Sequence, residues 1–385
     1  MQPSPIAIVG IGQTKPVRRS DQGIRSLVVE AIQAAIDDAG IAASEIDGVI
    51  SDGLIMPTTV PRDYVAAQFG IDRRFDGGMS FGGAGTAAAP GLAQLAISSG
   101  QARTVLYYFG VDWGTRASGP YGFHDLYGGK KVFEKPYGFV GQPSYFALWA
   151  QRYMHEFGLT EEDLATIAVT QRANALRNPG AQMTAPMSYA EYYDSRVVSA
   201  PLRVPDCCLI TDGACAFIMT DAERARDLPN PPVHVLGAGF GSEPITGDAV
   251  FTQPGGMMAI PGARSAADRA LQQAGLSLSD VDFAEVYDCF TISCLLQLEA
   301  IGFCGRGEGA AFIREKGIGI DGGLPVNTHG GLLSHSYLLG VEHVLEAVRQ
   351  LRGCAHAQIA DAGIGLVGGL ANPDYGVLLL GKDAA

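Results

Sequence analysis

Apolar positions along the chain alternate between short unbroken runs and helix-spaced stripes, a pattern typical of strands and helices that follow one another. The run IAIVGIG at 6–12 predicts a buried strand that enters a glycine turn, and residues 23–39 carry apolar side chains at helical spacing. Gly40 fits the C-terminal cap of that helix. Further buried strands are predicted at 46–51 and 104–110. This order predicts an α/β protein with a largely parallel sheet covered on both faces.

The second half of the chain repeats the first. The segment DDAGIAASEIDGV aligns with QQAGLSLSDVDFA, so that Gly40 matches Gly275 and Asp47 matches Asp282, both at an offset of 235 residues. A common helix–loop–strand unit would explain part of this likeness, but the shared string favours a duplication. We expect two similar halves with an insertion rich in Gly, Pro and Tyr. The predicted parts are 1–111 (start of the first half), 112–200 (inserted loop domain), 201–230 (rest of the first half) and 231–385 (second half).

Composition excludes several classes of protein. Hydrophobic residues make up 47% of the chain, enough for a large core, and the net charge of −13 comes without any run of Lys and Arg. Nucleic acid is therefore not an expected partner. The chain has no long apolar span typical of a membrane helix, and its first residues do not resemble a signal peptide. Seven cysteines without a CxxC pair argue against a zinc site or a disulfide framework, which predicts a cytoplasmic protein.

Two segments carry candidate chemistry. The string AEVYDCFT ends a predicted strand with Tyr287 and Asp288 side by side. The string NTHGGLLSHSYLLG contains His329 and Tyr337 in a loop that leads into a helix. A half-buried packing role is the common one for tyrosine, and a buried histidine bonded to a loop carbonyl is as common as a catalytic one.

These strings, together with IAIVGIGQT and ITDGACAFIM, resemble the thiolase superfamily, in its sterol-carrier-protein-x and lipid-transfer-protein-like branch. The resemblance covers nearly the whole chain and implies a thiolase fold: two similar βα halves in α-β-α-β-α layers with an inserted loop domain. Enzymes of that branch carry a nucleophilic Cys at the start of a small-residue helix and two catalytic His. Here Gly83 stands at the Cys position, and Tyr287 and Tyr337 stand in the places of the His. This departure is similar to the steroid side-chain-cleaving aldolases, which lack the Cys.

The resemblance to these aldolases implies retro-aldol cleavage of a β-hydroxyacyl-CoA. The expected substrate is a 17-hydroxy steroid side-chain acyl-CoA, which gives a 17-ketosteroid and propionyl-CoA without a covalent intermediate. One Tyr is expected to act as base on the β-hydroxyl and the other as acid to the enolate, in an order that the sequence leaves open. His329 is the candidate for polarising the thioester carbonyl or assisting a Tyr, and Asp288 either orients a neighbour or acts directly.

The remaining expectations concern ligands and partners. Gly83, Gly330 and Gly331 are candidates for close backbone approach to the CoA-bearing substrate, and Lys130 and Lys131 for contact with its phosphates, although a solvated loop is the more common role for such lysines. No cofactor or metal is expected in the chain itself. The resemblance implies a homodimer and a small OB-fold, zinc-ribbon partner in a heterotetramer, with any zinc in that partner.

Two other functions remain open. The chain could be a degenerate thiolase or acyl-CoA transferase that uses Cys289 or another thiol, or a non-catalytic subunit that binds acyl-CoA or sterol. The paired replacement of His by Tyr favours the aldolase, because decay of a site rarely installs the same titratable group twice.

Overall fold

The computed structural model describes residues 5–52, 60–79, 82–117, 119, 128–139, 141–244, 260 and 262–384, and the following statements concern these residues. The strands are β1 Ile6–Gln13, β2 Gly48–Asp52, β3 Phe75–Met79, β4 Thr104–Asp112, β5 Val197–Ser199, β6 Leu202–Arg203, β7 Asp212–Asp221, β8 Val233–Ser242, β9 Phe283–Val286, β10 Ile364–Ala371 and β11 Asp374–Gly381. The α-helices are α1 Ile24–Ala39, α2 Arg62–Phe69, α3 Gly82–Ser98, α4 Gly128–Phe133, α5 Gln142–Phe157, α6 Glu161–Leu176, α7 Tyr189–Asp194, α8 Ala222–Ala225, α9 Ala263–Ala274, α10 Thr291–Ile301, α11 Gly309–Lys316 and α12 Val341–Arg352.

In the described part of the chain, nine strands form one mixed sheet in the order β3-β2-β4-β7-β1-β8-β11-β10-β9. The prediction of a largely parallel sheet is wrong, since only the pairs β2–β3, β2–β4 and β9–β10 are parallel. The central pairs, from β4–β7 to β10–β11, are antiparallel. A buried strand reads as an unbroken apolar run in either direction, so the sequence pattern did not reveal this.

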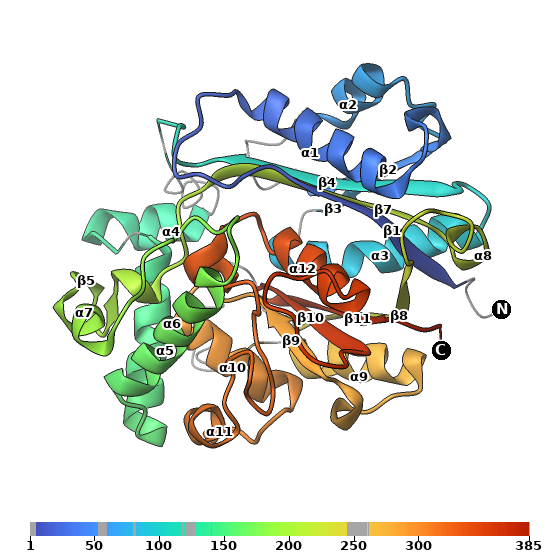
Figure 1. Ribbon diagram of the computed structural model, residues 1–385. Helices are drawn as coiled ribbons and strands as arrows, with labels where there is room; N and C mark the ends of the chain where they lie inside the picture. Colours follow the sequence, from blue (N-terminus) through green and yellow to red (C-terminus); the bar gives the residue numbers. More distant parts are fainter. Residues whose placement is uncertain are drawn as a thin grey trace.

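The elements stack in layers (Figure 1). Helix α1 covers β1, β4 and β7 on one outer face, and α9 covers β8 and β11 on the other. Helices α3 and α12 lie between the two halves of the sheet and contact strands of both. The halves meet through a short antiparallel pairing of β1 with β8, which joins Ala7 to His234 and Ile8 to Val233. This arrangement confirms the predicted α-β-α-β-α thiolase fold.

The internal duplication appears in matching details. Gly40 and Gly275 both end a helix in the left-handed conformation, at φ angles of 65° and 68°. Asp47 accepts hydrogen bonds from the backbone N–H groups of Arg103 and Thr104, where β4 begins, at 2.8 and 2.9 Å. Asp282 does the same for the start of β10, with two bonds of 2.8 Å. The two aspartates thus tie the same helix–turn–strand unit to its neighbouring parallel strand in each half.

The insertion between β4 and β7 gathers α4 to α7 on one side of the layers (green in Figure 1). Its two longer helices, α5 and α6, have 16 residues each. The segment GGKKVFEKP differs from the predicted loop, because Gly128–Phe133 forms α4 and Lys135–Tyr137 forms a short 3₁₀ turn. Pro136 falls in the first turn of the latter, where its missing N–H costs little. The division of the chain at 111/112, 200/201 and 230/231 stays a prediction.

Candidate active site

The two predicted tyrosines meet in the structure. The hydroxyls of Tyr287 and Tyr337 share a short hydrogen bond, although 50 residues separate them in the chain. Their rings lie edge to face with centroids 6.0 Å apart, and the side chains are only 6% and 5% exposed. A pair of phenols in direct contact can pass a proton from one oxygen to the other.

Tyr287 follows β9 directly, and its backbone is held from two sides. Its N–H donates to Gly368 O on β10 (3.1 Å), and Gln297 Nε2 on α10 donates to Tyr287 O (2.8 Å). Gln297 Oε1 in turn accepts from the Tyr375 hydroxyl at 2.9 Å. These bonds fix the direction in which the Tyr287 ring leaves the strand.

Gly83 lies directly against the ring of Tyr287. A methyl group at Gly83 would lie 2.5 Å from Tyr287 Cδ2, 2.6 Å from Cε2 and 2.9 Å from Leu370 O. Such distances are well inside carbon–carbon contact, so the ring fills the space that any side chain at Gly83 would need. The start of α3 therefore approaches the tyrosine pair with its backbone alone.

Tyr337 is positioned by residues from the first half of the chain. Its ring stacks on Trp113, which follows β4, with centroids 4.4 Å apart and planes 22° from parallel. Its N–H donates to Thr211 Oγ1 at 2.9 Å, and Thr211 donates to Gln182 Oε1 at 3.0 Å. Both halves of the fold and the insertion thus contribute to the placement of this hydroxyl.

Burial keeps the two phenols and the nearby cysteine thiols neutral. Loss of water raises the pKa of both phenols, Tyr287 and Tyr337, well above the ordinary value of a tyrosine. Burial likewise raises the pKa of the Cys289 thiol to about 12, and that of Cys208 well above its usual range. A tyrosine already ionised to a phenolate, or a cysteine already ionised to a thiolate, is therefore not favoured at this site in the resting protein.

Asp288 links the segment that follows β9 to the segment that contains Gly331 and Leu332. Leu332 N–H donates to Asp288 Oδ1 at 2.8 Å, while Oδ2 has no hydrogen-bond partner in the described chain. A side chain at Gly331 would lie 2.1 Å from that Oδ2, and Gly331 has a φ of 60°, so glycine is required there for both reasons. The His343 ring also approaches this carboxylate, with Nε2 3.5 Å from Oδ1.

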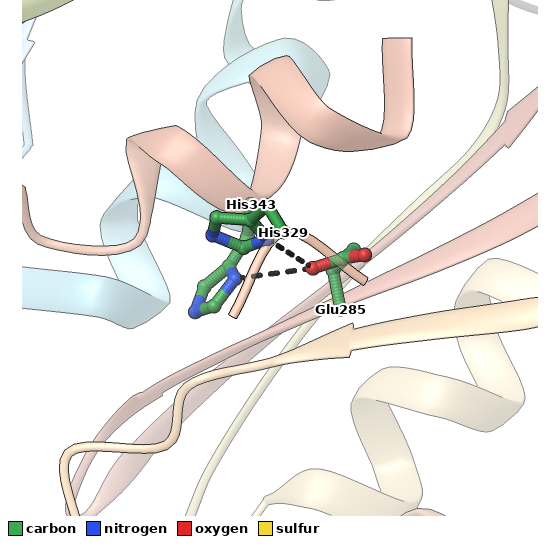
Figure 2. Close-up of side chains that lie close together, drawn as sticks. All are labelled: Glu285, His329 and His343. Carbon is green, nitrogen blue, oxygen red and sulfur yellow. Dashed lines mark hydrogen bonds and ion pairs between the residues drawn. The ribbon is translucent and has the colours of Figure 1, made fainter. Parts of the chain in front are cut away.

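Behind the tyrosines lies a fully buried cluster of Glu285, His329 and His343 (Figure 2). His329 Nδ1 is 3.1 Å and His343 Nδ1 is 3.4 Å from the same oxygen, Glu285 Oε2. Burial opposes charge on the carboxyl, but the adjacent imidazoles outweigh it and lower the pKa of Glu285. Burial also opposes charge on His343, but Asp288 and Glu285 together raise its pKa above the ordinary value.

The insertion packs against the loop that carries His329 and donates a hydrogen bond to it. Asn174 Nδ2 on α6 donates to Asn327 O at 3.2 Å, and a methyl at Gly330 would lie 2.5 Å from Ala175 Cβ. Gly330 has a φ of 108°, a conformation that other residues rarely adopt. The predicted glycine positions 330 and 331 thus serve backbone geometry and tight packing, and their contact with a ligand stays a prediction.

The structure brings together most of the predicted site. Tyr287, Tyr337 and Gly83 are in contact, and Asp288 and His329 line the adjoining buried cluster. Lys131 lies apart in α4 with its side chain exposed, and the side chain of Lys130 is outside the described residues. CoA contacts by both lysines stay predictions.

Sequence reasoning missed several residues of the site: Trp113, Glu285, Gln297 and His343. Glu285 and Gln297 carried a signal, since each is a single polar residue in an apolar run that the structure buries completely. His343 carried a weaker signal in the sequence, because its side chain faces the cluster only after α12 has packed.

Comparisons with known proteins agree with this fold. The family of thiolase C-terminal domain-like proteins matches residues 247–374. A steroid side-chain-cleaving aldolase of Thermomonospora curvata is 35% identical over 390 residues, covering 99% of each chain. The 17-hydroxy-3-oxo-4-pregnene-20-carboxyl-CoA lyase of Mycobacterium tuberculosis is 34% identical, covering 97% of this chain and 98% of its own. The solved structure of an Ltp2-ChsH2(DUF35) aldolase superposes with a TM-score of 0.91 at 33% identity, covering 99% of this chain and 98% of that one.

The layered fold alone defines a protein of the thiolase class. With relatives this similar over nearly their full length, the chain belongs to the thiolase superfamily, in the sterol-carrier-protein-2-thiolase-like branch that includes the steroid side-chain-cleaving aldolases. Among the described helices, none has the length and apolarity needed to cross a membrane.

Proposed function

We propose that this enzyme is a carbon–carbon lyase that cleaves a β-hydroxyacyl-CoA by a retro-aldol reaction, with Tyr287 and Tyr337 as its proton-transfer pair. The observation that carries the proposal is the hydrogen bond between the two hydroxyls at the point where Gly83 leaves no room for a nucleophile. The substrate class follows the names of the two relatives, which point to a 17-hydroxy steroid side-chain thioester.

The proton balance of the reaction suits a neutral pair of phenols. The β-hydroxyl loses its proton, the bond between the α and β carbons breaks, and the electron pair of that bond becomes the thioester enolate. A proton then reaches the α carbon, so the net result is one proton moved from oxygen to carbon. One tyrosine accepts the hydroxyl proton while its own proton passes through the shared hydrogen bond, and the other tyrosine delivers a proton to the α carbon. Neither phenol needs to be ionised beforehand, which agrees with the raised pKa of both.

The enolate oxygen needs hydrogen-bond donors aimed at it. The first N–H groups of a helix have no partner within the helix and can bind an anion, and α3 begins at Gly82, beside the Tyr287 ring. We therefore assign enolate stabilisation to this helix end. The predicted contact of His329 with the thioester is a weaker proposal, because its ring is completely buried and faces Glu285.

The thiol-based alternative finds little support in the geometry. Acyl transfer needs a thiolate, whereas burial raises the pKa of Cys289 to about 12. The non-catalytic alternative does not account for two buried hydroxyls held in mutual contact by Gln297, Thr211 and Trp113.

The partners are part of the same proposal. The related structure contains a DUF35 protein by name, and we propose that this chain also works with a small DUF35-type, OB-fold partner that carries any zinc ribbon. A homodimer within a heterotetramer and a cytoplasmic location complete the proposal, with the acyl-CoA as the ligand and no separate cofactor.

The test is a product assay on the chain co-produced with such a partner. The complex receives 17-hydroxy-3-oxo-4-pregnene-20-carboxyl-CoA without free CoA, and mass spectrometry follows the products. We expect a 17-ketosteroid and propionyl-CoA. Tight binding of the thioester without turnover would instead establish the binding-subunit alternative, and turnover that survives Tyr287→Phe and Tyr337→Phe unchanged would rule out the tyrosine pair.

A further inference from the structure

Three donor atoms converge in the buried cluster behind the tyrosines. Two imidazole nitrogens, one from His329 and one from His343, face the same oxygen of Glu285 at 3.1 and 3.4 Å (Figure 2). One ligand atom from each of the three residues lies within 4.8 Å of the others. A tetrahedral ion with metal–ligand distances of about 2.0–2.1 Å holds its ligand atoms about 3.3–3.4 Å apart. The two separations from Glu285 Oε2 are close to that spacing.

The outer surroundings of two of these donors, His343 and Glu285, also match a metal site. Metal-binding histidines generally direct their second nitrogen toward a carboxylate or carbonyl, which sets the tautomer and the ring orientation. His343 has this arrangement, with Nε2 3.5 Å from Asp288 Oδ1. The second oxygen of Glu285 accepts hydrogen bonds from Thr328 N–H (3.0 Å) and Thr328 Oγ1 (2.8 Å), which leaves Oε2 directed at the imidazoles.

An independent observation comes from His329 itself. Its side chain is 0% exposed, its Nδ1 lies 3.1 Å from Glu285 Oε2 without the geometry of a hydrogen bond, and its Nε2 has no hydrogen-bond partner among the described residues. Buried ring nitrogens without hydrogen bonds are costly, so this arrangement requires an explanation. An ion bound to Nδ1 would satisfy the nitrogen that faces Glu285.

The local charge favours a cation as well. Four carboxyl groups are buried in this region, on Glu285, Asp288, Glu342 and Glu346, each at most 2% exposed. Arg349 lies 3.7 Å from Glu346, and the other three carboxyl groups have no arginine or lysine partner among the described residues. A divalent ion would offset part of the cost of burying them.

We propose that Glu285, His329 and His343 bind a divalent transition-metal ion of the zinc class, and that this ion has a structural role. Two nitrogens and one carboxylate oxygen are donors that such ions favour. The three residues come from β9, from the loop before the π-helix Gly331–His335, and from α12. The ion would therefore tie together the segments that carry Tyr287 and Tyr337 without touching the substrate. The site is independent of the proposed reaction.

The test measures metal content rather than activity. The tag-free complex of the full chain with its partner is grown with added zinc and analysed by inductively coupled plasma mass spectrometry, in wild type, His343→Gln and Glu285→Gln. His155→Gln, an exposed histidine on α5, is the matched control. We expect each cluster variant to lose about one metal ion per chain relative to wild type and to His155→Gln. Any zinc in the partner contributes equally to all samples, so it does not affect the difference in metal content between them.

Wild-type protein supplies a second readout in case a variant fails to fold. Chelation should lower the Tm of the complex, added Zn²⁺ should restore it, and Co²⁺ should give the visible absorption of a tetrahedral site. Co²⁺ absorption that is unchanged in His343→Gln would place the ion elsewhere. If wild type holds no more metal than the cluster variants, or if no metal is found beyond the amount bound by the purified partner, protons or water hold the cluster together and the proposal is wrong.

Discussion

The ring of Tyr287 occupies the space in front of Gly83: a methyl group on Gly83 would lie 2.5 Å from Tyr287 Cδ2. A side chain at residue 83 and the present position of Tyr287 therefore exclude each other. The absence of a nucleophile and the presence of the phenol are two aspects of one packing arrangement. A simple return to cysteine at residue 83 would not restore a thiolase, because the ring would have to move first.

Gly83→Ala tests this steric relationship. The added methyl should displace Tyr287, destabilise the protein by about 1–3 kcal/mol and lower kcat/KM by about 100-fold, since a misplacement of about 1 Å has effects of that order. Thermal unfolding and steady-state kinetics measure both effects. Gly23→Ala is the matched control, because a methyl at that position meets nothing within 4 Å. Full activity in Gly83→Ala would show that the ring does not need its present position.

The tyrosine pair should be sensitive to removal of either hydroxyl. Tyr287→Phe and Tyr337→Phe keep the rings and remove only the oxygens that share the hydrogen bond. Each should lower kcat by about 10²–10⁴-fold, the range of general acid–base catalysis, with KM little changed. Tyr64→Phe on α2, in an outer layer away from the site, should retain wild-type kinetics. A loss confined to KM would mean that the hydroxyls bind substrate rather than transfer protons.

The thiols offer a third test. Burial raises the pKa of Cys289 and Cys207 to about 12, so at pH 8 almost none of either thiol is ionised, while Cys354 is exposed at the surface. Iodoacetamide at pH 8 should therefore modify Cys354 and leave Cys289 intact, with activity retained. Peptide mass mapping gives the modified sites, and Cys354→Ser removes the expected label. Inactivation that follows the labelling of Cys289 would revive the thiol-based alternative.

Gln297 should act as a positioning residue for Tyr287. Gln297→Leu removes the bond to Tyr287 O and leaves the hydroxyl of Tyr375 without its acceptor. Loss of a buried partner of this kind costs about 1–3 kcal/mol of stability, and kcat should fall while substrate binding is kept. Gln297→Glu retains an acceptor for Tyr375 but loses the donor to Tyr287 O. If its kcat equals that of wild type, the bond to the Tyr287 backbone is not needed.

Parts of this protein were predictable from sequence for clear physical reasons. The pairing of Gly40 with Gly275 and of Asp47 with Asp282 reflects local helix caps and turns, which short strings encode. Strand direction was not encoded in this way, since parallel and antiparallel buried strands share the same apolar pattern.

The site residues also divide into those that local strings identify and those that only the folded chain brings together. Tyr287 and Tyr337 stood out because of the strings around them, but their mutual contact depends on the packing of β9 against the loop before α12. The cluster of Glu285, His329 and His343 draws on three separate elements. No spacing in the sequence brings these residues together, and only the folded chain shows that they share one buried volume.

The central claim is cleavage by proton transfer through two tyrosines, without acyl transfer to a thiol. The most direct measurement is the single-turnover rate of the complex as free CoA is raised from zero, with the intact mass of the chain recorded at each quench time. We expect full cleavage at zero free CoA, a rate independent of its concentration, and an unmodified chain mass throughout. Cleavage that begins only when free CoA is added, with an acyl adduct on the chain, would contradict this account and establish thiolysis.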